Sequence, residues 1–172
     1  MRGKTRAVTL TALISAVTVI ILYLASVWPT GRIGLVALAS VFAAASIVES
    51  GVIQGVYVYV ISSVLGMLLL PDKSAPLLYI LFFGYYPVVK CLAERSKGRL
   101  LQLIIKLIAF NVALSVIWIF LRALVFGYLG ALPEAILLYI GCNAAFIAFD
   151  YGFSKLIWFY IERISKHMKK TQ

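Results

Sequence analysis

Six long apolar segments, separated by short polar breaks, limit what this chain can fold into more than any other feature of its sequence. A helix that crosses a bilayer needs about 20 mostly apolar residues, and each segment reaches that length or nearly reaches it. Pro and Gly, which interrupt helices, fall in the breaks. The sequence therefore predicts an all-α, polytopic integral membrane protein, a six-helix transmembrane bundle that forms a single domain over residues 1–172. We expect the spans at residues 7–28, 33–48, 52–70, 76–91, 100–126 and 132–160.

Composition points to the same environment. Of the 172 residues, 63% are hydrophobic and 13% are charged, and the mean hydropathy is +1.03. A soluble domain of this size needs more charge to cover its surface, so we expect the outer surface to meet lipid. A net charge of +10 in a soluble protein would indicate nucleic acid. Here the basic residues gather at the ends and in one middle segment, a distribution typical of membrane topology, so we expect no nucleic-acid partner.

The placement of Lys and Arg predicts the orientation, because cytoplasmic loops carry an excess of basic residues. With six spans, three basic groups fall on one side, whereas five spans would divide them. The other side holds only Arg32 and Lys73, with Arg122 inside a span near that face. The sequence thus predicts two cytoplasmic termini in a cell membrane of the bacterial plasma-membrane type. The three groups are Arg2, Lys4 and Arg6; Lys90, Arg95, Lys97, Arg99 and Lys106; and Lys155, Arg163, Lys166, Lys169 and Lys170.

The second, fourth and last segments depart from the ordinary length of a span, and the first raises the separate question of a signal peptide. The first begins with basic residues, as a secretory signal peptide does, but its apolar run of about 22 residues exceeds the usual roughly 7–15, so we interpret it as a retained span. The second and fourth are short, and flanking residues or partial burial among neighbours would complete them. The last is long, so we expect its end beyond Asp150 to continue as a helix into the cytoplasmic interface.

Motifs of enzymes and metal sites are missing from the sequence. It contains no HExxH, no glycine-rich phosphate loop and no GxSxG. His167, which is the only histidine, lies in the basic tail, and Cys91 and Cys142 are isolated from each other. We therefore expect the protein not to be an enzyme, and we expect no catalytic residues, no cofactor and no metal site.

Three predicted spans carry polar and aromatic residues spaced 4, 3 and 4 apart, which places them on one helix face. Charges at the centre of a span cost about 2.5–3.5 kcal/mol, so such faces turn toward the bundle or a wet cavity. Aromatic walls with a few amides and hydroxyls suit a flat or partly polar small molecule. The three sets are Tyr79, Phe83, Tyr86 and Lys90; Asn111, Ser115, Trp118 and Arg122; and Tyr139, Asn143, Phe146 and Asp150.

An alternative is that these side chains only hold the helices together. Polar contacts between transmembrane helices contribute ~0.6–2 kcal/mol each without any ligand. For Asn111, Ser115 and Asn143, the sequence favours ligand contact and helix–helix association equally.

The charged residues in the spans divide between the two faces. Arg122 is well placed for function, since it lies near the outer face, where Glu134 or a ligand anion would pair with it. Lys106 and Asp150 lie toward the inner face, and we expect a structural ion pair between them.

Small residues recur on the first three predicted spans. The first carries Ala12 and Ala16, and faces of this kind let helix backbones approach closely. They mark either internal packing or a docking surface for another membrane protein, and internal packing is the commoner case. On the second and third spans the small residues are Ala37, Ala39, Ser40, Ala43 and Ala44, and Gly51, Gly55, Ser62 and Gly66.

After its basic start, the chain runs into the segment Leu10-Thr11-Ala12-Leu13-Ile14-Ser15-Ala16, which resembles the first helix of the substrate-binding S components of energy-coupling factor (ECF) vitamin transporters. Those proteins are similar in length, have six membrane helices with both ends in the cytoplasm and carry an alanine motif in the first helix. The resemblance covers nearly the whole chain, in architecture and in one short motif. It implies that Ala12 and Ala16 face a transmembrane coupling protein, whose partners are two cytoplasmic ATPases.

The same resemblance implies where a vitamin or other micronutrient binds. The outer halves of the fourth to sixth helices, with the first extracellular loop, would hold this small solute, and the protein itself would hydrolyse nothing. With Phe83 added from the face of the fourth span, the candidate ligand-binding residues are Tyr79, Phe83, Trp118, Arg122, Tyr139 and Asn143.

Two other functions stay open. One is a non-transport membrane scaffold of envelope or cell-shape machinery, similar in outline to the MreD type, in which the polar faces only join helices. The other is an independent small permease, which ranks last because such proteins ordinarily show internal repeats or discontinuous helices and the sequence has no convincing duplication.

Overall fold

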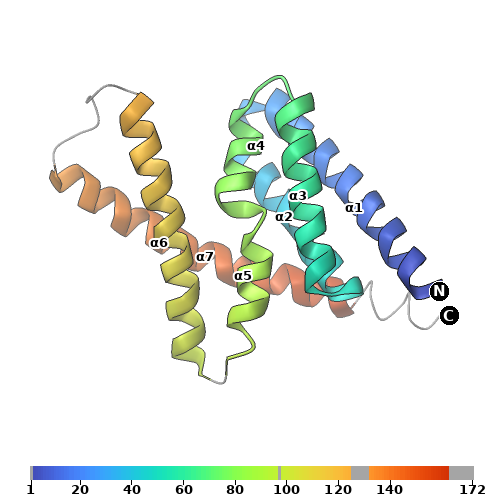
Figure 1. Ribbon diagram of the computed structural model, residues 1–172. Helices are drawn as coiled ribbons and strands as arrows, with labels where there is room; N and C mark the ends of the chain where they lie inside the picture. The colour runs from blue at the N-terminus through green and yellow to red at the C-terminus, as the bar shows by residue number, and fades with distance from the viewer. Residues whose placement is uncertain (1, 97, 125–131, 163–172) are drawn as a thin grey trace. The chain divides into compact units, whose positions relative to one another are not determined.

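The computed structural model describes residues 2–96, 98–124 and 132–162, and over these residues it contains helices and no strand (Figure 1). The chain is therefore all-α, as the sequence predicts. Its elements in order are α1 (Arg2–Val27), the 3-10 turn η1 (Pro29–Gly31), α2 (Arg32–Ser50), α3 (Val52–Leu69), α4 (Ser74–Leu78), the π-helical segment η2 (Tyr79–Phe83), α5 (Tyr86–Ala93), α6 (Arg99–Leu124) and α7 (Leu132–Tyr160).

Six stretches of the described residues are long and apolar enough to cross a bilayer, which makes the protein a multi-pass membrane protein. The two short predicted segments reach full length by taking in flanking residues, since the second stretch has 19 residues and the fourth has 20. The fourth is a composite of α4, η2 and α5. The six stretches are Thr5–Val27, Arg32–Ser50, Val52–Leu69, Ser74–Ala93, Arg99–Ile119 and Ile136–Tyr160.

The chain divides into two compact units. Unit 1 comprises Met1–Leu92 together with Leu156–Gln172, and unit 2 comprises Ala93–Lys155. Helices α1 to α5 thus belong to unit 1 except for the last residue of α5, and α6 with most of α7 forms unit 2.

Small residues bring the first three helices of unit 1 together. Each of α1, α2 and α3 contacts the other two, and α4 packs on all three (Figure 1). The buried positions of α2 include Ala39, Ser40 and Ala43, and those of α3 include Gly55 and Gly66. Lipid supplies no hydrophobic driving force between helices, so close backbone approach through such residues is what holds them. Internal packing, the commoner of the two predicted roles, is therefore the role of these residues in α2 and α3.

Helix α1 turns a hydroxyl-bearing face to this core. Thr11, Ser15 and Thr18 are at most 6% exposed. Each hydroxyl donates to the backbone carbonyl four residues earlier at 2.8 Å, so the face is buried without an unpaired hydroxyl. Ser15 also accepts, at its backbone carbonyl, the hydroxyl of Ser62 from α3 at 3.4 Å.

A glycine turn sets the approach of α2 to α3. Gly51 links the two helices with φ of +102° and ψ of 173°, a backbone conformation that is essentially restricted to glycine. One turn into α3, a Cβ built on Gly55 would overlap the side chain of Ile47. The sharp turn and the missing side chain together allow the two helices to pack directly after the reversal.

Gly55→Ala should lower the free energy of unfolding by about 1–3 kcal/mol, because the new methyl group has to displace Ile47. The measurement is unfolding of the purified protein in mixed micelles, followed by circular dichroism. In the Ile47→Ala background the same change should cost at least about 1 kcal/mol less.

Gly34→Ala is the matched control, because no atom lies within 4 Å of a Cβ at that helix position. It should be neutral or stabilising, since Ala has the higher helix propensity. Equal losses at Gly34 and Gly55 would contradict this account of the packing between α2 and α3.

Candidate functional site

A polar face joins α6 and α7 within unit 2, and it consists of residues that the sequence analysis placed on two helix faces. Asn111 and Asn143 form a reciprocal amide pair, in which each side-chain nitrogen donates to the other's side-chain oxygen, at 2.9 and 3.1 Å. The second N–H of each amide donates to a backbone carbonyl one turn earlier, Leu107 for Asn111 and Tyr139 for Asn143. Both N–H donors of both amides are therefore used.

The pairing continues along the helices in antiparallel register. The Ser115 hydroxyl lies 3.0 Å from the Tyr139 hydroxyl and also donates to the Asn111 carbonyl. The rings of Phe110 and Phe146 stack with centroids 4.5 Å apart. Two of the three predicted faces thus meet each other inside one unit. The residue pairs along this face, in order, are Lys106 with Asp150, Phe110 with Phe146, Asn111 with Asn143, and Ser115 with Tyr139.

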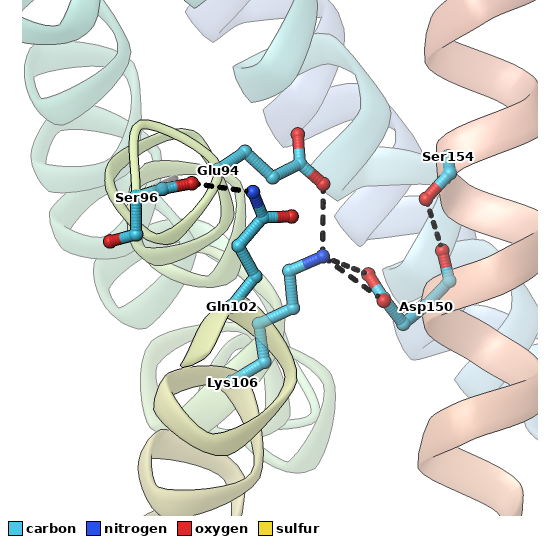
Figure 2. Close-up of polar contacts among 6 residues, drawn as sticks. All are labelled: Glu94, Ser96, Gln102, Lys106, Asp150 and Ser154. Carbon is cyan, nitrogen blue, oxygen red and sulfur yellow. Dashed lines mark hydrogen bonds and ion pairs between the residues drawn. The ribbon is translucent and has the colours of Figure 1, made fainter. Parts of the chain in front are cut away.

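A charge cluster closes one end of the polar face (Figure 2). The Lys106 ammonium lies 3.2 Å from the Asp150 carboxylate, which confirms the predicted ion pair, and 2.9 Å from the Glu94 carboxylate. The Lys106 side chain is 7% exposed, while those of Asp150 and Glu94 are 16% and 45% exposed. Around the cluster, the Gln102 amide donates to the Ser96 carbonyl and the Ser154 hydroxyl to the Asp150 carbonyl.

The sequence analysis missed Glu94 because it lies in the connection between α5 and α6, where no helical periodicity applies. Lys106 stands seven residues into α6, about 10 Å along the axis at 1.5 Å per residue. Its flexible stem carries the ammonium part of the way back toward the connection, where it meets the Glu94 carboxylate, as long basic side chains do near the ends of spans. Two carboxylates, from Glu94 and Asp150, therefore share the one ammonium of Lys106.

The predicted face of the fourth span lies in unit 1 and is buried there. Tyr79 and Tyr86 are 0% exposed, Lys90 is 2% exposed and Phe83 is partly buried. Tyr79 belongs to the apolar core of unit 1 together with Leu22 and Val36, and Phe83 packs against that core. The Tyr79 hydroxyl has no hydrogen-bond partner among the described residues.

Of the remaining ligand-binding candidates, Trp118 lies on α6 and is partly buried. Arg122 also falls within α6, but its side chain lies outside the described residues, as does that of Glu134 in α7, so their expected pairing stays a prediction.

Ala12 and Ala16, the partner-docking candidates, are both exposed on α1. They lie on a different side of α1 from the buried face that carries Thr11, Ser15 and Thr18, roughly 110° around the helix. The exposed small-residue face begins earlier in α1, with Thr9, whose hydroxyl donates to the Thr5 carbonyl at 3.0 Å. This arrangement separates Ala12 and Ala16 from the small residues of α2 and α3, which are internal.

A second ion pair, which the sequence analysis did not identify, lies between the start of α2 and the start of α4. The Arg32 guanidinium bonds the Ser74 hydroxyl and the Asp72 carboxylate. Asp72 also accepts the Ser74 backbone N–H at 2.9 Å, and the Lys73 ammonium donates to the Met67 and Leu70 carbonyls at the end of α3. The backbone N–H and the hydroxyl of Ser74, with the charge of Arg32, lower the pKa of Asp72 from its ordinary 3.8. Within the short connection, Asp72 accepts the first backbone N–H of α4, and Lys73 donates to carbonyls at the end of α3. The contacts of Arg32 with Asp72 and Ser74 link the start of α2 to the start of α4.

Comparison of the chain with protein-family models, with curated proteins and with solved structures found no match.

Removing Lys106 and Asp150 together should cost less than the sum of the two single losses. Asp150→Asn and Lys106→Met should each lower the free energy of unfolding by about 1–3 kcal/mol, because each removes one side of a buried ion pair. The loss in the double variant should be at least about 1 kcal/mol smaller than the sum of the two single losses, measured by unfolding in mixed micelles. Lys155→Met, at an exposed site on the same helix as Asp150, should change stability by less than about 0.5 kcal/mol. Additive losses would show that Lys106 and Asp150 do not interact.

Acid should weaken the connection at Asp72. A carboxyl whose folded pKa is depressed stabilises the fold above its unfolded pKa, and that contribution is lost as the pH falls through the folded pKa. The thermal midpoint should therefore fall between about pH 5 and pH 3, and part of this fall should disappear in Asp72→Asn, which should be the less stable protein at about pH 6. Identical pH profiles for the two proteins would contradict the assigned role of Asp72.

Proposed function

We propose that the protein is the membrane-embedded, substrate-binding subunit of an ECF-type uptake transporter for a vitamin or other micronutrient. It binds a small solute from outside and docks on a transmembrane coupling protein, which two cytoplasmic ATPases drive. The protein itself is not an enzyme in this proposal. It lies in a bacterial-type plasma membrane with both termini in the cytoplasm, the orientation that the distribution of Lys and Arg favours.

The observation that carries the proposal is the exposed face of α1. A helix that packs in one bundle needs only one contact face, and α1 uses its Thr11, Ser15 and Thr18 face for that purpose. Ala12 and Ala16 lie on another face and leave the backbone of α1 open to close approach. A neighbouring membrane helix gains more from such a face than lipid chains do, since close approach adds backbone contacts. These are also the residues that the resemblance to S components assigns to docking.

Within unit 2, the residues that contact the solute in this proposal are Trp118, Arg122, Tyr139 and Asn143. Asn143 already bonds Asn111, and Tyr139 already bonds Ser115. A solute amide, hydroxyl or carbonyl would replace these partners, and it would have to bond Asn111 and Ser115 as well if no polar group is to lose its hydrogen bond. A flat, partly polar and largely uncharged solute fits this requirement best.

A membrane scaffold of envelope or cell-shape machinery is the second candidate, and the reciprocal amide pair favours it. Both N–H donors of Asn111 and Asn143 are used inside unit 2, as expected if the polar faces serve only to join helices. The two candidates predict different proteins and small molecules bound to this protein after it is extracted from the membrane in detergent.

The first test is affinity purification of the tagged protein from its native membrane in mild detergent, with proteins and retained small molecules both identified by mass spectrometry. Recovery of a polytopic coupling protein with paired ATPases and of a bound micronutrient is the expected result. Recovery of envelope-synthesis or cytoskeletal proteins without a small molecule would overturn the proposal in favour of the scaffold.

The docking face has its own test, in which Ala12→Leu and Ala16→Leu are compared with a matched pair on another helix. Both substitutions should reduce recovery of the coupling protein at least tenfold, while the thermal midpoint and the retained solute stay unchanged. Ala144 and Ala148 of α7 are also exposed and four residues apart, so Ala144→Leu and Ala148→Leu should leave recovery unchanged. Loss of folding in the α1 variants, or equal effects of both pairs, would contradict the assignment.

A further inference from the structure

The fourth span changes its helix type partway along. After the short helix α4, the backbone N–H of Gly84 donates to the Tyr79 carbonyl five residues earlier, at 2.7 Å, which is the hydrogen bond of a π-helix. A turn at residues 84–85 follows before α5 begins at Tyr86. There the N–H groups of Val88 and Val89 both donate to the Tyr85 carbonyl, at 3.0 and 3.1 Å. The regular ladder of hydrogen bonds is therefore interrupted within a span.

A tyrosine from α3 holds this interruption in place. The Tyr59 hydroxyl donates to the Ile80 carbonyl inside η2, at 3.1 Å. Its ring contacts Tyr79, with centroids 6.1 Å apart, and the edge of Tyr85, at 6.3 Å. A carbonyl that leaves the helical ladder inside a membrane needs another donor, because no lipid group supplies one. Tyr59 provides that donor from a different helix.

The absence of a side chain at Gly84 leaves the space that the Tyr59 ring occupies. A Cβ at position 84 would lie 2.5 Å from an atom of the Tyr59 ring and 2.7 Å from an atom of the Tyr79 ring, closer than real Cβ atoms approach. Any side chain at that position therefore has to displace one of the two rings. The hydrogen bond of Tyr59 to Ile80 depends on the absence of a side chain at residue 84.

The π-helical conformation of η2 does not satisfy the hydrogen-bonding needs of the Tyr79 hydroxyl. The residue is 0% exposed, and its hydroxyl completes no hydrogen bond of ordinary geometry among the described residues, although the Ser62 hydroxyl lies near it. A buried donor without a partner is costly, and such a group in a native structure needs an explanation. The observed conformation of η2 gives the Ile80 carbonyl a donor and leaves the Tyr79 hydroxyl without a completed hydrogen bond, so the two groups favour different conformations of η2.

We propose that η2 is a hinge in the fourth span and that the Tyr59 hydroxyl is its latch. With the latch closed, the π turn persists and α5 keeps its present direction relative to α4. With the latch released, η2 returns to the regular α-helical ladder, a one-residue change of register that rotates α5 about its axis by about 100°. Packed helices switch between discrete arrangements of this kind more readily than they deform continuously. The inference stands on contacts within unit 1 and needs no solute or partner protein.

Hydrogen–deuterium exchange of the intact protein in detergent tests the latch. In Tyr59→Phe, peptides that cover residues 79–92 should exchange about three- to tenfold faster than in the unsubstituted protein, the effect of losing one hydrogen bond in a local opening. Gly84→Ala should act in the same direction. Tyr57→Phe is the matched control, since Tyr57 lies on the same helix and is 56% exposed, and its exchange should not change. Unchanged exchange in Tyr59→Phe, or a rise spread evenly over α1, α2 and α3, would overturn the proposal.

Tyr79→Phe separates a hinge from an ordinary buried hydrogen-bond network. Because the Tyr79 hydroxyl has no partner in the latched conformation, its removal should stabilise that conformation and slow exchange of the same peptides at least threefold. Exchange that is faster than in the unsubstituted protein, or equal to it, would mean that Tyr79 does not favour the released conformation, and the hinge would be wrong even if Tyr59→Phe behaves as expected.

Discussion

Hydrocarbon supplies no hydrogen bonds, and this constraint governs nearly every polar contact in the spans. The hydroxyls of Thr11, Ser15 and Thr18 bond their own helix, the amides of Asn111 and Asn143 bond each other, and Lys106 is shared between two carboxylates. Each device satisfies its donors without water. The amide pair and the ion pair of Lys106 with Asp150 also fix α6 against α7, whereas the hydroxyls of Thr11, Ser15 and Thr18 bond only within α1.

The constraint also gives weight to the few exceptions. Among the described residues, the buried hydroxyls of Ser46, Ser63 and Tyr79 have no partner. A serine hydroxyl reaches several carbonyls of its own helix by rotating about one bond, so its cost is easily relieved. The Tyr79 hydroxyl stands at the end of a rigid ring, far from its own backbone, and only a change in the helix or in its neighbours can satisfy it. No rotamer change of Tyr79 alone removes this cost.

Sequence periodicity predicted the parts of the structure that depend on one helix at a time. The six spans, the shared faces of α6 and α7 and the pairing of Lys106 with Asp150 follow from apolar length and from spacings of 3 and 4 residues. The contacts of Glu94, the π segment at Tyr79 and the tether from Tyr59 to Ile80 depend on how separate segments meet. No local pattern encodes them. For the same reason the sequence left open which small residues are internal, and burial separates those of α2 and α3 from Ala12 and Ala16.

The polar face of unit 2 is not equally strong along its length. The Asn111–Asn143 and Ser115–Tyr139 pairs join neutral groups, and contacts of this kind contribute about 0.6–1.7 kcal/mol in a membrane. The Lys106 cluster joins charges, and removing one member of it should cost about 1–3 kcal/mol, as predicted above. Any parting of α6 from α7 therefore begins at the neutral end, with the charge cluster as the fixed point. A solute of the proposed kind would lower the cost at the neutral end alone, because its amide or hydroxyl would take the place of Asn111 and Ser115 beside Asn143 and Tyr139 and could not replace an ammonium held by two carboxylates.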